Sequence, residues 1–119
     1  MTNDDWAARP AGEPWFLLIE SQGHCAPQEA GFRRDAVAQA RAGRPVVMFL
    51  VQDAVALAFP GSDAELDVFQ EAGGLLAADG FSLTQRGLEQ NTLRDGVKVT
   101  GMDEVASWVL DPDANVVWH

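Results

Sequence analysis

The most reactive side chains lie together near the start of the chain. Cys25, the single cysteine, follows His24 and stands two residues before Pro27. Proline is favoured in the first turn of a helix, so this spacing predicts that Cys25 lies just before a helix N-terminus. The helix dipole and the free N–H groups there stabilise a thiolate, the nucleophilic form of cysteine, and His24 could add positive charge or act as a base. The alternative interpretation is that Cys25 is a small residue packed in a loop.

Two carboxylates and one guanidinium form a second group of candidates. Asp53 and Asp79 each follow an apolar run that indicates a buried strand, and Arg86 stands beside Gly87. Paired carboxylates can act as acid and base if one of them has a raised pKa, and Arg86 could bind an anion. The alternatives are that the aspartates cap the helices that follow them and that Arg86 pairs with a nearby acid.

No pattern in the sequence indicates a metal or a cofactor. His24, Cys25 and His119 lack the spacing of metal ligands, and one cysteine excludes an internal disulfide or a cysteine-rich cluster. The glycine-rich signatures of dinucleotide-binding and phosphate-binding loops are both missing. We therefore expect neither a metal nor a cofactor.

Length and charge narrow the possible functions. With 119 residues the chain has the size of one domain, and its 47% apolar and 22% charged residues are typical of globular proteins. The net charge of −10 argues against binding to nucleic acid or to an anionic membrane surface, because both need a basic face. No apolar run reaches the roughly 18–20 residues of a membrane helix, and the acidic start lacks the order of a signal peptide, so we expect a cytoplasmic protein.

Alternating strands and helices must position these candidates. Short apolar runs closed by turn residues predict strands, and the stretches between them have helical character. The predicted strands cover residues 15–19, 45–51, 75–78, 96–99 and 115–118, and the predicted helices cover 28–42, 53–59, 64–72 and 102–110. This order is typical of an α/β fold with helices on both faces of a mostly parallel sheet. We expect a flexible lead-in over residues 1–14 and one layered domain over 15–119.

The same pattern predicts where charged side chains lie. In the helix over 28–42 the apolar residues share one face, and Arg33, Arg34 and Arg41 fall largely off it. Residues 45–85 include six acids and no basic residue. Such a tract is most simply a solvated helix face, although it could also meet a basic partner.

Three segments match a known pattern in their order and spacing. They are GRPVVMFLVQDAV (residues 43–55), ADGFSLTQRGL (78–88) and DGVKVTGM (95–102). Together they resemble the DsrE/DsrF/TusD-like sulfur-relay family, and the likeness runs from about Trp15 to residue 119. The resemblance implies a three-layer α/β sandwich that assembles as dimers, trimers or hexamers and transfers sulfur through a cysteine persulfide.

One position departs from the family pattern. The pattern has its persulfide cysteine eight residues before the glycine of an Arg-Gly pair, and in this chain that position is Asp79. A carboxylate cannot carry a sulfane sulfur, because that chemistry needs a thiolate. The resemblance therefore implies a divergent member without the usual relay cysteine.

The sequence is compatible with three functions. The first is a structural or interaction subunit of a homo-oligomer, with a second copy or another protein as its partner. The second is a thiol-dependent sulfur carrier or enzyme in which Cys25 is the nucleophile, assisted by His24 or Asp79. The third is a small-molecule enzyme or binding protein that uses Asp79, Asp53 and Arg86.

Overall fold

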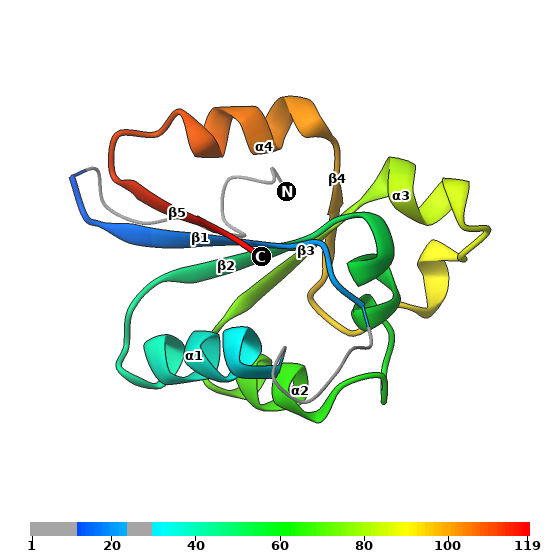
Figure 1. The fold of residues 1–119 in the computed structure, drawn as a ribbon, viewed down its shortest axis with the longest axis horizontal. Helices are drawn as coiled ribbons and strands as arrows, with labels where there is room; N and C mark the ends of the chain where they lie inside the picture. Colours follow the sequence, from blue (N-terminus) through cyan, green and yellow to red (C-terminus); the bar gives the residue numbers. More distant parts are fainter. Residues whose placement is uncertain (1–11, 24–29) are drawn as a thin grey trace.

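The computed structural model describes residues 12–23 and 30–119, in which the chain forms one α/β domain around a five-stranded sheet. All neighbouring strands pair in parallel, in the order β4-β3-β2-β1-β5 (Figure 1). The predicted fold class is thereby confirmed, and the carboxyl ends of all strands lie at one edge of the sheet. The strands are β1 (Trp15–Glu20), β2 (Val46–Leu50), β3 (Leu75–Asp79), β4 (Lys98–Thr100) and β5 (Ala114–Trp118).

The central strands form because their side chains are apolar on both sides of the backbone. All five residues of β2 are buried, and in β3 only Leu75 is partly exposed. The register places Leu18 beside Met48 and Phe49 beside Ala77. A parallel strand that is covered on both faces has a continuous apolar run instead of an alternating one, which is the pattern that predicted these strands.

Two helices cover one face of the sheet. α1 (Ala30–Arg41) and α2 (Ala64–Glu71) lie below the strands in Figure 1, and the 3-10 helix η3 (Gln52–Ala58) connects β2 to α2. Asp63 is the N-cap of α2, where its side chain accepts a hydrogen bond from the backbone N–H of Glu65. The core between these elements and the sheet contains Leu18, Met48, Leu66, Phe69 and Leu76.

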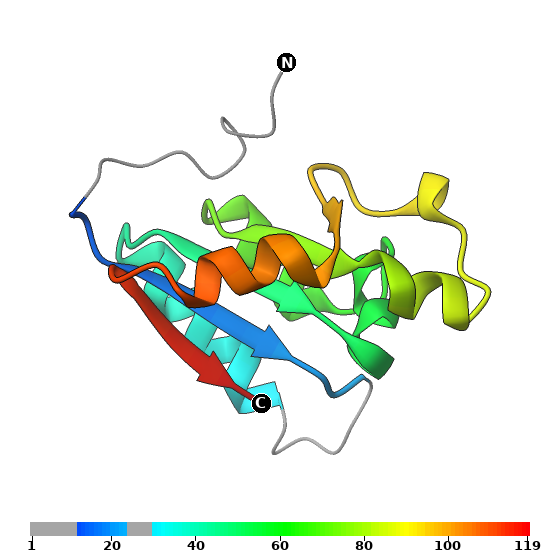
Figure 2. The ribbon, with the colours of Figure 1, turned by 90° about the horizontal axis from the view of Figure 1, so that it is seen from above.

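In the described part of the chain, a single helix covers the opposite face. α4 (Met102–Val109) runs above the strands in Figure 1 and lies over the sheet in Figure 2, and Val105 is its buried residue. The apolar side chains at both ends of this short helix, Met102 in its first turn and Leu110 at its C-cap, stay exposed to solvent. The smaller core on this face contains Trp15, Leu17, Ile19, Val47, Phe49 and Ala77.

Side chains hold the start of α4 to β4. Gly101 occupies the N-cap position and makes no side-chain hydrogen bond, whereas Thr100 and Lys98 both donate to the carboxylate of Glu104. Burial raises the pKa of Glu104, but the hydrogen bonds from Lys98 and Thr100 and the positive charge of Lys98 outweigh burial, so that the pKa lies below its usual value. The helix is thus fixed at the end that faces the carboxyl edge of the sheet.

The order of the strands reverses at β1. The chain reaches β2 through α1 on one face and reaches β5 through α4 on the other. In open parallel sheets, ligands bind in the crevice outside the carboxyl ends of the strands at such a point. The short helix α3 (Gly80–Gln85) directly follows β3 at the same edge, and the 3-10 helix η4 (Gln90–Thr92) precedes β4.

One expectation for α1 is wrong. Arg33 is buried, with 5% of the residue exposed, whereas Arg34 and Arg41 are exposed as predicted. Arg33 is buried because acidic side chains from β1 and from the start of α2 pair with its guanidinium. The predicted start of this helix, at Pro27, lies outside the described residues.

The same substitution at two glycines should have opposite effects on stability. A Cβ atom at Gly74 would lie 2.3 Å from the buried ring of Phe69, whereas one at Gly31 in α1 would meet nothing within 4 Å. We expect Gly74→Ala to lower the free energy of unfolding by about 1–3 kcal/mol through overpacking. Gly31→Ala should raise it by about 0.5–1 kcal/mol, because alanine favours the helix. Urea denaturation measures both changes, and a loss of stability in Gly31→Ala would contradict this account.

Candidate functional site

Asp79, which the sequence resemblance aligns with a relay cysteine, ends β3 and caps α3. It is buried, and its Oδ2 accepts hydrogen bonds from the backbone N–H of Ser82 (3.0 Å) and from the Ser82 hydroxyl (2.6 Å). Oδ1 is buried as well and has no hydrogen-bond partner among the described residues. The structure therefore gives Asp79 the capping role, which was one of its two predicted interpretations.

Ser82 connects Asp79 to the end of β2. Its Oγ accepts a hydrogen bond from the backbone N–H of Gln52 (2.9 Å) and donates its own proton to Asp79. Gln52 has a φ of 55°, and it is the single non-glycine residue with a positive φ in the described part of the chain. This conformation is disfavoured for a residue with a Cβ atom, so the hydrogen bond to Ser82 helps to hold the backbone at Gln52.

Asp53 and Arg86 pair with each other at the surface. Nη2 and Nε of Arg86 donate to Oδ1 of Asp53 over 3.0 and 3.3 Å, and the Asp53 side chain is 79% exposed. Arg86 also donates to the carbonyl oxygen of Ser82 (3.5 Å). Asp53, Asp79 and Arg86 therefore gather at one edge of the sheet around Ser82, as an exposed ion pair beside a buried cap.

Cys25 and His24 lie outside the described residues, so the predictions made for them stay predictions. Gly23, just before them in the sequence, lies close to Asp53 just after β2. A Cβ atom at Gly23 would lie 3.0 Å from the carbonyl oxygen of Asp53. Glycine at position 23 thus allows a close approach between the loop after β1 and the loop after β2.

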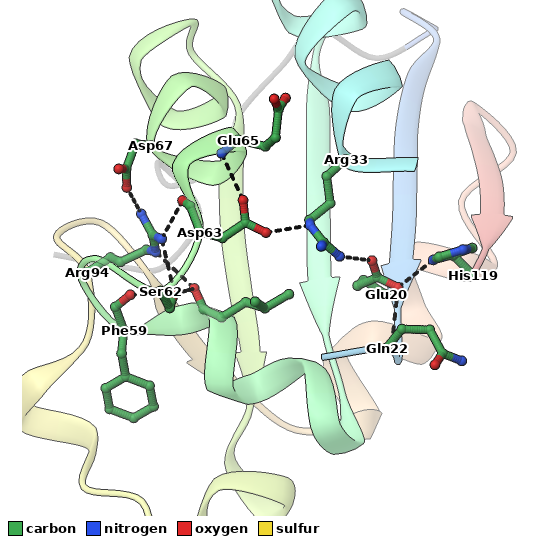
Figure 3. Close-up of polar contacts among 11 residues, drawn as sticks. Glu20, Gln22, Arg33, Phe59, Ser62, Asp63, Glu65, Asp67, Arg94 and His119 are labelled. Atoms are coloured by element: carbon green, nitrogen blue, oxygen red, sulfur yellow. Dashed lines mark hydrogen bonds and ion pairs between the residues drawn. The ribbon is translucent and has the colours of Figure 1, made fainter. Parts of the chain in front are cut away.

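A cluster of buried charge that was not predicted lies at the end of β1 (Figure 3). Glu20 is fully buried and accepts hydrogen bonds from Nη1 of Arg33 (2.8 Å) and from the backbone N–H of Gln22 (3.2 Å). Nδ1 of His119 lies 2.7 Å from Oε2 of the same carboxylate. Arg33 also pairs with Asp63, so one guanidinium connects β1, α1 and the start of α2.

His119 is fixed by its backbone and by its ring. Its N–H donates to the carbonyl oxygen of Ile19 (2.8 Å), and its carbonyl oxygen accepts from the hydroxyl of Ser21 (2.7 Å). The imidazole stacks on Phe32 at a centroid distance of 4.6 Å. Nδ1 is the ring nitrogen placed to donate to the Glu20 carboxylate, and Nε2 is the other ring nitrogen. A carboxylate that orients an imidazole in this way is an arrangement suited to proton transfer.

Arg94 is a second buried arginine with several polar partners (Figure 3). Its guanidinium donates to the carbonyl oxygen of Leu57 (2.9 Å) and to that of Asp63 (3.0 Å), and to the hydroxyl of Ser62 (3.2 Å). It also pairs with Asp67. These contacts tie the segment before β4 to η3 and α2.

The expectation of a solvated acidic face over residues 45–85 is wrong for two of its acids. Asp79 is buried as a helix cap, and Asp63 is nearly buried against Arg33. Asp53 and Asp67 are exposed as expected, although each also pairs with an arginine from outside this tract. The tract lacks basic residues of its own, but the fold brings them to it from α1, from the turn after α3 and from the segment before β4.

A hollow of about 540 Å³ lies between α4 and the carboxyl ends of the neighbouring strands, and we call it the α4 hollow. Phe49 and Val105 are its most buried lining residues, whereas Met102, Leu110 and Trp118 stand exposed around it. A second hollow, of about 550 Å³, lies beside α2 and is lined by Asp67, Glu71, Arg94 and Asp95 among others. Asp53, Asp79 and Arg86 line neither of the two.

Residues 12–23 and 30–119 contain no group of three or more His, Cys, Asp or Glu side chains that could hold a metal ion. They also contain no helix long and apolar enough to cross a membrane.

Comparison with solved structures identifies similar folds. The structure of the YchN protein from E. coli superposes with a TM-score of 0.77 at 19% sequence identity, covering 89% of this chain and 99% of that one. The MTH1491 protein of unknown function from Methanobacterium thermoautotrophicum superposes with a TM-score of 0.70 at 12% identity, covering 90% of this chain and 99% of that one. No protein-family model and no curated protein matches the sequence. The likenesses support the DsrE-like fold that the sequence resemblance implied.

The buried pair of Glu20 and Arg33 should behave non-additively on substitution. We expect Arg33→Met to lower the free energy of unfolding by about 3–5 kcal/mol, because it removes the cation that pairs with a fully buried carboxylate. The double variant with Arg33→Met and Glu20→Leu should lose less free energy of unfolding than the two single variants lose together, because the double variant leaves no unpaired buried carboxylate. Urea denaturation of the wild type, the two single variants and the double variant measures the coupling energy between Arg33 and Glu20. Arg34→Met, at an exposed position of the same helix, is the control and should change stability by less than about 0.5 kcal/mol; additive changes would contradict the coupling.

Proposed function

We propose that this chain is a DsrE-like protein that does not relay sulfur and that acts as a structural or interaction subunit of a homo-oligomer. The observation that carries this proposal is the state of Asp79. Its carboxylate is buried and accepts two hydrogen bonds from Ser82, so the side chain at the relay position serves as the cap of α3. An acceptor of sulfane sulfur must instead be a thiolate that a donor protein can reach.

The surface around α4 supports a role in assembly. Exposed apolar side chains gather there, with Met102 54%, Leu110 80% and Trp118 65% exposed. Contiguous apolar patches of this kind are uncommon on monomeric proteins and are typical of interaction sites.

A second copy of the same chain suits this surface. The residues that line the α4 hollow include no charged side chain, although the chain has a net charge of −10. Two copies that meet through an uncharged patch avoid the repulsion that two acidic surfaces would suffer. A partner recognised by its positive charge would bind the acidic surfaces instead.

The third function, small-molecule chemistry by Asp79, Asp53 and Arg86, receives less support. These residues do not line either hollow, and Asp53 and Arg86 neutralise each other at the surface. The thiol function of Cys25 concerns a residue outside the described ranges, and the sulfur-transfer experiment tests it directly.

Incubation with a cysteine desulfurase and cysteine tests the absence of a relay function. We expect the wild-type chain to gain much less than one sulfane sulfur per chain by mass spectrometry, because Asp79 offers no thiolate. Cys25→Ser is the matched control, since it removes the remaining thiol. Loading close to one sulfur per chain that disappears in Cys25→Ser would overturn the proposal and establish the thiol function.

Light scattering coupled to size-exclusion chromatography tests the assembly. We expect the wild-type chain to have a mass that is a multiple of the monomer mass. Leu110→Glu should raise the dissociation constant about tenfold or more, because it buries a carboxylate in an apolar contact. Ala38→Glu, at an exposed position of α1, should leave the mass unchanged. A monomeric wild-type chain at high concentration would contradict the role as a subunit.

A further inference from the structure

We propose that the α4 hollow binds a small, uncharged and largely apolar molecule. One copy of the chain supplies every lining residue, so the inference goes beyond the proposed function. The proposed assembly uses the same surface, so a second copy and the ligand compete for it. The hollow lies beside the ends of β1, β2 and β5, where Ser21, Gln52 and Trp118 contribute to its wall. This is the edge of a parallel sheet at which ligands bind in open α/β folds.

The size of the hollow fits a small molecule. Its volume of about 540 Å³ lies within the range of roughly 300–1,000 Å³ that is usual for ligand pockets. A ligand that enters displaces water from an apolar wall, which is favourable.

The lining determines the charge of the ligand. Phe49, Val51 and Val105 are apolar, and no Asp, Glu, Lys, Arg or His contributes to the wall. An anion would meet the field of a chain with a net charge of −10 and would find no cation to pair with. A cation would lose its water without gaining a carboxylate. An uncharged molecule carries neither penalty.

Gln52 gives the site a polar group. Its side-chain amide offers both donors and an acceptor, and Gln52 is an exposed residue of the wall. The backbone of Gln52 is held at a positive φ by the hydrogen bond to Ser82, which is itself bound to Asp79. Asp79 is thus a positioning residue for one wall of the hollow. The preferred ligand has an apolar body and one group that can hydrogen-bond to an amide.

Fluorescence titration of the full chain with N-phenyl-1-naphthylamine tests the proposal. This probe is uncharged and fluoresces more strongly in apolar surroundings. We expect saturable binding of one probe per chain, weakened at least tenfold in Ala106→Trp, because the larger side chain enters the hollow from α4. Ala38→Trp, at an exposed position of α1, is the matched control and should bind as the wild type does. Absence of saturable binding, or equal binding by Ala106→Trp, would overturn the proposal.

Two further measurements sharpen the test. The anionic analogue 8-anilinonaphthalene-1-sulfonate should bind at least tenfold more weakly than the uncharged probe, and equal affinity would overturn the charge argument. Gln52→Gly removes the amide while glycine accepts the positive φ, so the variant keeps its fold. It should bind 1-naphthol several-fold more weakly, and an unchanged affinity would remove Gln52 from the site.

The mass of each sample, measured by light scattering, separates this inference from the proposed function. Because the proposed assembly uses the same apolar surface, the titration is made at a concentration at which light scattering gives the monomer mass. A monomer that binds no probe there, with an oligomer at higher concentration, would overturn the ligand site and leave the subunit role intact. A chain that binds one probe and stays a monomer at high concentration would do the reverse.

Discussion

A parallel sheet in water needs an apolar layer on each of its faces, because its strands are joined by crossovers and its central strands are buried on both sides. Over residues 12–23 and 30–119, α1 and α2 form one layer, and α4 is the one helix of the other. A helix of eight residues is only about 12 Å long. The exposed apolar side chains around α4, and the hollow beside it, are consequences of this unequal cover.

Polar groups lie at the carboxyl edge of the same sheet. Two of them, Glu20 and Asp79, are buried acids that end strands, and each obtains its hydrogen-bond partners from different elements. Glu20 pairs with Arg33 from the helix that follows it, and His119 joins the pair from the end of β5. Asp79 instead binds the N–H and hydroxyl groups of Ser82 in the next turn. A buried carboxylate needs such partners, because its unpaired charge would cost several kcal/mol.

In this DsrE-like fold the acid that ends β3 starts a helix. Through Ser82, Asp79 also supports the strained backbone of Gln52. The side chain at position 79 therefore affects the wall of the α4 hollow without lining it. We infer a protein that acts by binding, at the uncharged lining of the α4 hollow.

The sequence by itself determined the fold class and the five strands, because a run such as Val46–Leu50 carries the signal of burial in its own composition. It also determined that position 79 holds no thiol. Only the tertiary structure decided that Arg33 is buried, since a charged residue on a helix is buried only where another element brings it a partner, here Glu20. The α4 hollow likewise depends on the tertiary structure, because its wall combines residues that lie far apart in the sequence, such as Phe49 and Trp118. No local sequence pattern indicates which apolar side chains a short helix leaves exposed.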